Sequence, residues 1–210
     1  MTFTNILESV KQYYSAKIAT YGATAQGVDW NSAESQSLRF AQLLKVCDLR
    51  QPFSIIDYGC GYGALLGYLR SWGLVVKYYG FDISESMISR ARELYREDDG
   101  AEFYSVPDSL SPADYTVASG IFNVKLQTSD EEWRAYMIDT LARMADLSVK
   151  GFSFNALTSY SDPERRRPDL YYADPLFWFD HCKRRYSRFV ALLHDYPLYE
   201  FTILVRKETF

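Results

Sequence analysis

Apolar residues follow two alternating patterns along most of the chain. Between positions 53 and 206, short apolar runs alternate with segments in which apolar residues recur every three or four positions. The short runs are typical of buried strands, and the longer spacing is typical of amphipathic helices. Strands that alternate with helices indicate βαβ units, with a parallel sheet and right-handed crossovers. The expected strands are 53–57, 74–81, 101–106, 115–119, 151–157, 188–193 and 198–206.

The last two expected strands are joined differently from the others. Only residues 194–197 separate them, which is too short for a crossover helix, so these strands are expected to be antiparallel neighbours. The pattern therefore predicts an α/β fold of the Rossmann-like, doubly wound kind. We expect a mostly parallel seven-stranded sheet that ends in a C-terminal antiparallel hairpin.

The first fifty residues follow a helical pattern. One helix is expected around Ile6–Tyr14, and a second is expected over Ala33–Cys47. Asn31 and Glu34 have the spacing of a capping box at the start of the second helix.

Composition and charge narrow the functional class. The 210 residues, of which 48% are hydrophobic and 24% charged, fit one soluble domain with its own core. The 23 basic residues are outnumbered by 27 acidic ones, which argues against a general nucleic-acid binder. The sequence has no signal-peptide pattern, no membrane-spanning run, and no cysteine or histidine spacing typical of a disulfide framework or metal site. We expect a cytoplasmic monomer or homodimer that acts on a small molecule and binds neither nucleic acid nor membrane.

Candidate chemistry gathers where the first expected strand ends. Asp57 is followed closely by the glycine-rich loop Gly59–Gly63. Ligands of open α/β sheets bind beyond the carboxyl ends of the strands, and glycines there allow positive φ angles and a close approach of the backbone. Asp82 ends the next strand, where its carboxylate can accept hydrogen bonds from both hydroxyls of a ribose. These residues therefore predict a nucleoside-containing ligand at this edge of the sheet.

Two cofactors compete for this loop. Residues 59–64 also match the dinucleotide fingerprint G-x-G-x-x-G/A, with an acidic residue about 20 positions later. A pyrophosphate requires bare amides at a helix N-terminus, and Asp57 beside it would repel the phosphate charges. S-adenosylmethionine (SAM) instead carries an ammonium and a sulfonium group, which suit an acidic strand end. SAM is therefore the favoured cofactor, and a nicotinamide cofactor is the alternative.

Several segments resemble the motifs of a known family. Ile55–Gly63 is similar to the first motif of the class I SAM-dependent methyltransferases, and Gly80–Ser84 is similar to their second. Asp108–Leu110 resembles their adenine-side motif, and Leu198–Arg206 resembles their closing antiparallel strand. The resemblance extends over about residues 53–206 and implies a small, bacterial-type, single-domain methyltransferase. It also implies that S-adenosylhomocysteine (SAH) is the product.

The resemblance further implies roles for individual residues. Asp57 and Gly59 would hold the methionine end of SAM and Asp82 the ribose, while Ile83, Asp108 and Ser109 would contact the adenine. A simple turn residue is the alternative for Asp108. Residues 1–50 would form a helical N-terminal lid or cap, and residues 51–210 the SAM-binding methyltransferase core. The expected cofactor-binding residues are Asp57, Gly59, Cys60, Gly61, Gly63, Asp82, Ile83, Asp108, Ser109, Ser119, Tyr14 and Trp30.

The methyl acceptor is less closely defined. Asn123 follows the fourth expected strand, where it could orient an acceptor hydroxyl or cap the next helix. His194 with Asp195 could supply a general base and its orienting carboxylate, or His194 could be an ordinary surface residue. The [DN]-P-P-[YF] sequence of amino-methyltransferases is absent, which disfavours a nucleobase or amide nitrogen as acceptor. We expect methyl transfer to an oxygen of a small molecule, with a catalytically silent SAM-binding protein and an NAD-dependent oxidoreductase as alternatives.

Overall fold

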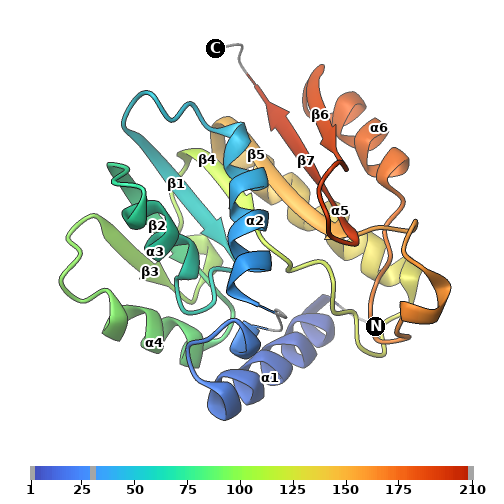
Figure 1. Cartoon of the computed structure of the whole chain (residues 1–210), viewed down its shortest axis with the longest axis horizontal. Helices are drawn as coiled ribbons and strands as arrows, with labels where there is room; N and C mark the ends of the chain where they lie inside the picture. Colours follow the sequence, from blue (N-terminus) through green and yellow to red (C-terminus); the bar gives the residue numbers. More distant parts are fainter. Residues whose placement is uncertain (1–2, 29–31, 208–210) are drawn as a thin grey trace.

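The computed structural model describes residues 3–28 and 32–207, which fold around a mixed sheet of seven strands (Figure 1). The strands lie in the order β3-β2-β1-β4-β5-β7-β6, and β1 to β5 are parallel, whereas β7 runs antiparallel between β5 and β6. This arrangement confirms the predicted α/β fold and its antiparallel hairpin. The strands are β1 (Phe53–Tyr58), β2 (Val76–Phe81), β3 (Ala101–Tyr104), β4 (Ala113–Ala118), β5 (Ser148–Leu157), β6 (Phe189–Leu193) and β7 (Glu200–Arg206).

Helices cover both faces of the sheet. In Figure 1, α2 crosses in front of the sheet and α5 lies behind it. The buried side chains of α2, α3 and α4 pack on one face, and those of α5 and α6 pack on the other. The α-helices are α1 (Phe3–Tyr21), α2 (Ala33–Leu43), α3 (Ala64–Ser71), α4 (Glu85–Leu94), α5 (Asp130–Asp146) and α6 (Pro175–Arg185), and the short 3-10 helices are η1 (Gln26–Val28), η2 (Leu44–Val46), η3 (Pro107–Ser109) and η4 (Pro163–Arg165).

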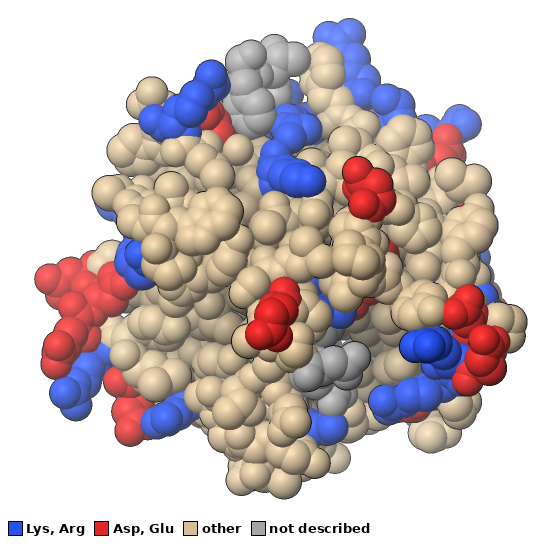
Figure 2. Space-filling view, viewed as in Figure 1, with Lys and Arg blue, Asp and Glu red and all other residues tan. Residues whose placement is uncertain are grey.

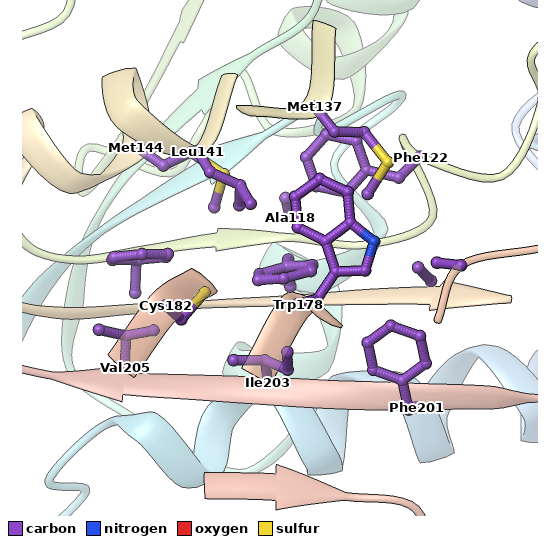
Figure 3. Close-up of a cluster of buried hydrophobic side chains, with 14 of the residues drawn as sticks. Ala118, Phe122, Met137, Leu141, Met144, Trp178, Cys182, Phe201, Ile203 and Val205 are labelled. Atoms are coloured by element: carbon purple, nitrogen blue, oxygen red, sulfur yellow. The ribbon is translucent and has the colours of Figure 1, made fainter. Parts of the chain in front are cut away.

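Each face of the sheet has its own apolar core. Figure 3 shows Trp178 of α6 among side chains from α5 and β7, including Met137 and Ile203. On the other face, Phe40 of α2 and Leu65 of α3 pack with apolar residues of β1 and β2. Because burying one large apolar side chain contributes about 1.5–3 kcal/mol, these two cores hold the helices firmly against the sheet.

Serine side chains mark the starts of several helices. Ser129 and Glu132 form the predicted capping box at α5, and Ser84 caps α4 as predicted. At α2 the cap is Ser32, whereas the predicted Asn31 lies outside the described residues. In each case the hydroxyl accepts a hydrogen bond from a first-turn N–H group that has no partner within the helix.

The two N-terminal helices occupy different parts of the fold. The expected helix over 33–47 ends as an α-helix at Leu43 and continues as η2, and its buried Phe40 joins the core. In contrast, α1 runs across the carboxyl ends of the strands (Figure 1), where Ile6 is buried and Ser15 Oγ lies 2.9 Å from Ser84 Oγ. Of these two helices, α1 lies across the edge of the sheet where a ligand would bind, whereas α2 packs mainly on a face of the sheet.

The surface carries mixed charge. On the face seen in Figure 2, basic and acidic side chains alternate around the rim, and much of the centre carries neither. Within residues 3–28 and 32–207, no helix has the length and apolar character needed to cross a bilayer, and no group of metal-ligating side chains is found. Cys47, Cys60 and Cys182 are all buried and free.

Candidate functional site

A pocket of about 840 Å³, partly open to solvent, lies at the carboxyl ends of β1, β2 and β4. Residues of α1, α2 and α5 complete its walls. Of the predicted cofactor-binding residues, those that line the pocket are Tyr14, Asp57, Gly59, Cys60, Gly61, Asp82, Ile83 and Ser119.

The glycine loop forms the floor of the pocket through its backbone conformation. Gly59 has a φ of 85° and Gly61 a φ of 55°, in the left-handed region that favours glycine. The N–H groups of Gly59 and Cys60 both donate to the Phe81 carbonyl, at 2.7 and 2.8 Å. A Cβ atom on Gly59 would lie only 2.2 Å from Ile121 Cγ2. The loop is therefore tied to the end of β2 and packed against the segment that follows β4.

Asp82 is held in place by two backbone N–H groups. Its Oδ2 accepts a hydrogen bond from Gly61 N at 2.9 Å, and its Oδ1 accepts one from Ser84 N at 2.8 Å. Burial raises the pKa of Asp82 to about 6, although these two hydrogen bonds act in the opposite direction. A carboxylate oxygen can accept more than one hydrogen bond, so Asp82 keeps accepting capacity for a ligand.

Asp57 is a second carboxyl group in the same pocket, and it is more deeply buried than Asp82. It is only 2% exposed, and the Tyr78 hydroxyl donates to its Oδ2 at 2.6 Å. Burial raises its pKa to about 7, the Tyr78 hydrogen bond lowers it, and the negative charge of Asp82 raises it. An added positive charge would favour the ionised form of both groups. The pair is therefore suited to a cationic ligand.

The wall opposite the glycine loop is formed by the segment after β4 and by α5. Ser119 Oγ is buried and has no hydrogen-bond partner among the described residues, although Ser119 lines the pocket. The next residue, Gly120, donates its N–H to Asn155 Oδ1 at 2.7 Å. Ile121 and, from α5, Tyr136 extend this wall. This side thus combines an unused hydroxyl with apolar and aromatic surface.

Four predicted cofactor residues are not placed at the pocket. Gly63, with a φ of 86°, caps α3, and a Cβ there would lie 2.8 Å from the ring of Tyr95. Asp108 is exposed and pairs with Arg143 at 2.6 Å, and Ser109 is also exposed. Trp30 lies outside the described residues. The loop after β3 therefore lies at the surface, where Pro107–Ser109 form the short 3-10 helix η3.

Neither predicted catalytic residue lines the pocket. His194 is exposed in the β6–β7 hairpin, with its ring centre 5.9 Å from that of Tyr160. Asn123 is buried, and its Nδ2 donates to Glu200 Oε1 at 3.4 Å. The prediction that Asn123 could cap the following helix is wrong, because Ser129 caps α5.

The sequence analysis missed several residues that line the pocket. The motif loop itself contains Tyr62, but the others come from helices or from apolar positions that resemble ordinary core residues. Their approach depends on how α1, α2 and α5 pack, which residue spacing does not reveal. The missed residues are Val10, Val28, Gln36, Phe40, Tyr58, Tyr62, Ala64, Phe81, Met87, Gly120, Ile121 and Tyr136.

The charge of the pocket distinguishes between classes of ligand. Among the described residues that line it, the charged side chains are Asp57 and Asp82, and no lysine, arginine or histidine is present. Two carboxyl groups disfavour a pyrophosphate and suit a ligand with positive charge and hydroxyl groups. The geometry therefore fits SAM better than a nicotinamide dinucleotide.

Comparisons with known proteins agree with this geometry. A family model described as a methyltransferase domain matches residues 55–146. Rv1506c of Mycobacterium tuberculosis, which is named as a methyltransferase, is 53% identical over 164 residues, which are 78% of this chain and 99% of that protein.

Solved structures show the same fold at much lower identity. The complex of DhpI with SAH is 16% identical with a TM-score of 0.65, and the match covers 98% of each chain. The mycolic acid cyclopropane synthase CmaA1 with SAH is 13% identical with a TM-score of 0.55, over 77% of this chain and 62% of that one. The identity to Rv1506c, the glycine loop and the sheet topology together show that the chain belongs to the class I SAM-dependent methyltransferases and uses SAM as its cofactor.

Proposed function

We propose that SAM binds in the pocket beneath α1, with its methionine end near Asp57 and its ribose at Asp82. The observation that carries this proposal is the pairing of two carboxyl groups, the buried Asp57 and the half-buried Asp82, with a glycine loop in a left-handed conformation. Ser119 Oγ supports it further, because a buried hydroxyl without a partner gains a hydrogen bond when a polar ligand arrives.

Each wall would act on a different part of the cofactor. Asp82 would accept hydrogen bonds from the ribose hydroxyls, while its bonds to Gly61 N and Ser84 N hold its carboxylate in one orientation. Asp57, fixed by Tyr78, would place negative charge near the ammonium group. Ile83, next to Asp82 along the chain, would contact the adenine.

We infer that the acceptor is an oxygen of a small molecule. When bound, SAM supplies a methyl group already activated by the positive sulfonium. The chain then has to align the acceptor oxygen at about 3–3.5 Å from that carbon and to exclude water. Apolar and aromatic side chains of α1, α5 and the segment after β4 offer a surface for such a molecule. The structure of DhpI with SAM and HEP, with a TM-score of 0.63, provides a precedent for two ligands on this fold.

No side-chain base is required in this proposal. Among the described lining residues there is no histidine, and His194 is exposed in the β6–β7 hairpin. A carboxylic acid has lost its proton at neutral pH before transfer, and so has a phenol acidified by electron-withdrawing groups. Alignment would then be the main contribution of the chain.

We propose that the lid consists of α1 rather than of all residues 1–50. Val10 and Tyr14 of α1 line the pocket, and Ile6 anchors the start of this helix in the core. In contrast, α2 is packed into the core through Phe40 and Leu43. Movement of α1 alone would open a path to the pocket.

The central experiment identifies the acceptor. The purified protein is incubated with SAM labelled in its methyl group and with a small-molecule cell extract, and mass spectrometry is used to find labelled products. We expect SAH to form together with one labelled compound that carries an O-methyl group, and the Asp82→Ala variant to form much less of both at the same SAM concentration. Calorimetry that showed binding of NAD, but of neither SAM nor SAH, would overturn the proposed site. A labelled N-methyl product would overturn only the acceptor assignment.

A further inference from the structure

A buried polar network connects two walls of the pocket. Arg39 of α2 donates from Nε to Glu200 Oε2 at 2.8 Å and from Nη2 to Glu200 Oε1 at 2.9 Å. Asn155 of β5 donates from Nδ2 to Glu200 Oε2 at 2.8 Å, and its Oδ1 accepts the N–H of Gly120 at 2.7 Å. We call these four residues the Arg39 network.

The network is well shielded from solvent. Asn155 is fully buried, Glu200 is 1% exposed and Arg39 is 7% exposed. Asn123 adds a further hydrogen bond to Glu200, at 3.4 Å. The attraction within a buried ion pair largely offsets the cost of removing both charges from water, so such a pair adds little net stability. The pair instead fixes the orientation of α2 relative to β7, because an arginine that donates two hydrogen bonds to one carboxylate can adopt few orientations relative to it.

The two ends of the network lie beside residues that line the pocket. On α2, Arg39 falls between Gln36 and Phe40, both of which line it. At the other end, Gly120 is itself part of the lining and lies between Ser119 and Ile121. Glu200, the first residue of β7, joins the two ends through its hydrogen bonds to Arg39 and Asn155.

The hydrogen bond from Gly120 N–H to Asn155 anchors the segment after β4 next to the place where this segment contacts the glycine loop. Ile121 is packed so closely on Gly59 that a Cβ there would lie 2.2 Å from Ile121 Cγ2. The unpartnered Ser119 Oγ lies on the other side of Gly120. A shift of the Gly120 amide would therefore move both the hydroxyl and the side chain that contacts the glycine loop.

We propose that the Arg39 network is a positioning device that fixes the segment after β4 relative to α2 and so keeps the pocket in the shape that binds SAM and SAH. Arg39, Glu200 and Asn155 are positioning residues, because they act on the ligand through Gly120 and its neighbours. This inference rests on the proposed binding of SAM in the pocket.

The test compares two buried polar residues of the same strand. Asn155→Ala removes the anchor of Gly120, whereas Ser153→Ala removes a different buried hydrogen bond, from Ser153 Oγ to the Leu43 carbonyl at 2.9 Å. We expect Asn155→Ala to raise the calorimetric Kd for SAH about tenfold, equivalent to the loss of one good hydrogen bond, and Ser153→Ala to change it less than about twofold. Equal Kd values for Asn155→Ala and the wild type would overturn the proposal.

Exchanging the amide of Asn155 and the carboxylate of Glu200 tests whether SAH binding depends on the hydrogen bonds of the network or only on the stability of the fold. Asn155→Asp alone places two carboxyl groups side by side, and we expect it to weaken SAH binding at least as much as Asn155→Ala. The double variant Asn155→Asp, Glu200→Gln again has one carboxylate and one amide, and it can still accept the Gly120 N–H. The amide at position 200 offers Arg39 only one acceptor oxygen in place of the two-point contact, so we expect partial recovery, with a Kd between those of Asn155→Asp and the wild type. A double variant that bound no better than Asn155→Asp alone would contradict the proposed geometry.

A measurement on the unmodified protein covers the case in which a variant does not fold. Amide hydrogen exchange followed by NMR should show the Gly120 amide strongly protected in the ligand-free wild type, and in folded Asn155→Ala its exchange should be at least about tenfold faster. An unprotected Gly120 amide in the wild type would overturn the anchoring itself. Protection of Gly120 in a wild-type protein that bound neither SAM nor SAH would instead contradict the proposed function and with it the role of the anchor in binding.

Discussion

The ends of β1 and β2 differ sharply from the ends of β3 and β6. At the first two strands, the buried Asp57 is bonded to Tyr78 and the half-buried Asp82 to two backbone amides, within one pocket. At the other two, Asp108 and His194 are exposed outside it. All four are chemically suitable side chains at the same edge of the sheet. A suitable residue type is therefore not enough to predict a binding residue, because the surrounding backbone must also enclose its side chain in the pocket.

The largest effect should come from a side chain on the glycine loop. Gly59→Ala combines a left-handed φ with a Cβ placed 2.2 Å from Ile121, so we expect a loss of about 2–5 kcal/mol in the free energy of unfolding. Gly73→Ala is the matched control, because Gly73 also has a positive φ but no atom within 4 Å of the added Cβ. Urea denaturation should show a clearly smaller loss for Gly73→Ala. Equal losses would mean that the close packing of the loop contributes nothing.

Asp82 and Asp108 provide a direct comparison of the two regions. Asp82→Ala should weaken SAH binding by about 1.5–3 kcal/mol, which is typical of hydrogen bonds to a charged group. Asp108→Ala removes only an exposed ion pair with Arg143 and should change the binding free energy by less than about 0.5 kcal/mol. Both values can be measured by calorimetry. A comparable loss for Asp108→Ala would show that the loop after β3 closes on the adenine when ligand is bound, as its motif resemblance implied.

The two carboxyl groups of the pocket should make SAH binding depend on pH. The pKa is about 7 for Asp57 and about 6 for Asp82, and a bound ammonium favours the ionised forms. SAH affinity should therefore rise about tenfold or less between pH 5.5 and 8, and Asp57→Asn should flatten the profile. The stability of the ligand-free protein should change with pH in the opposite direction to the SAH affinity. A raised carboxyl pKa makes the folded state bind protons more tightly, so unfolding free energy falls as pH rises from about 3.8 towards 7.

The smallest effect should come from the hairpin candidates. With the identified acceptor, His194→Ala and Asp195→Asn should each leave kcat within a few-fold of the wild type, because His194 lies outside the pocket. Loss of a general base would instead lower kcat by about 10²–10⁴-fold. A drop of that size in steady-state kinetics would place the β6–β7 hairpin at the reacting oxygen and would remove the contrast between the two regions.

Most of the fold could be predicted because its signals are local. The alternation of apolar runs identified the strands, and the short connection at 194–197 predicted the antiparallel hairpin correctly. The capping box at Ser129 marked the start of α5. Strand ends were less well defined, since β5 begins at Ser148 rather than at 151. The residue at which a strand begins or ends depends on pairing with the neighbouring strands, and the spacing of apolar residues along one strand does not reveal that pairing.

The candidate site was predictable only where a motif specifies the backbone. The glycines at 59 and 61, together with Asp57 and Asp82, line the pocket as predicted. Tyr136 and Gln36 reach it only after their helices have packed on the sheet, and along the sequence they resemble ordinary helix residues. The Arg39–Glu200 pair joins residues 161 positions apart, so no local pattern could indicate it.

The position of β7 also has consequences for how the protein folds during synthesis. Although β7 follows β6 in the chain, it lies between β5 and β6 in the sheet. While the ribosome is still making residues 200–206, β5 therefore has one unpaired edge, and such edges are the surfaces through which nascent chains aggregate. Glu200 enters with the same strand, so the salt bridge to Arg39 cannot form earlier. The binding pocket should thus reach its final shape late, after much of the surrounding core has already condensed.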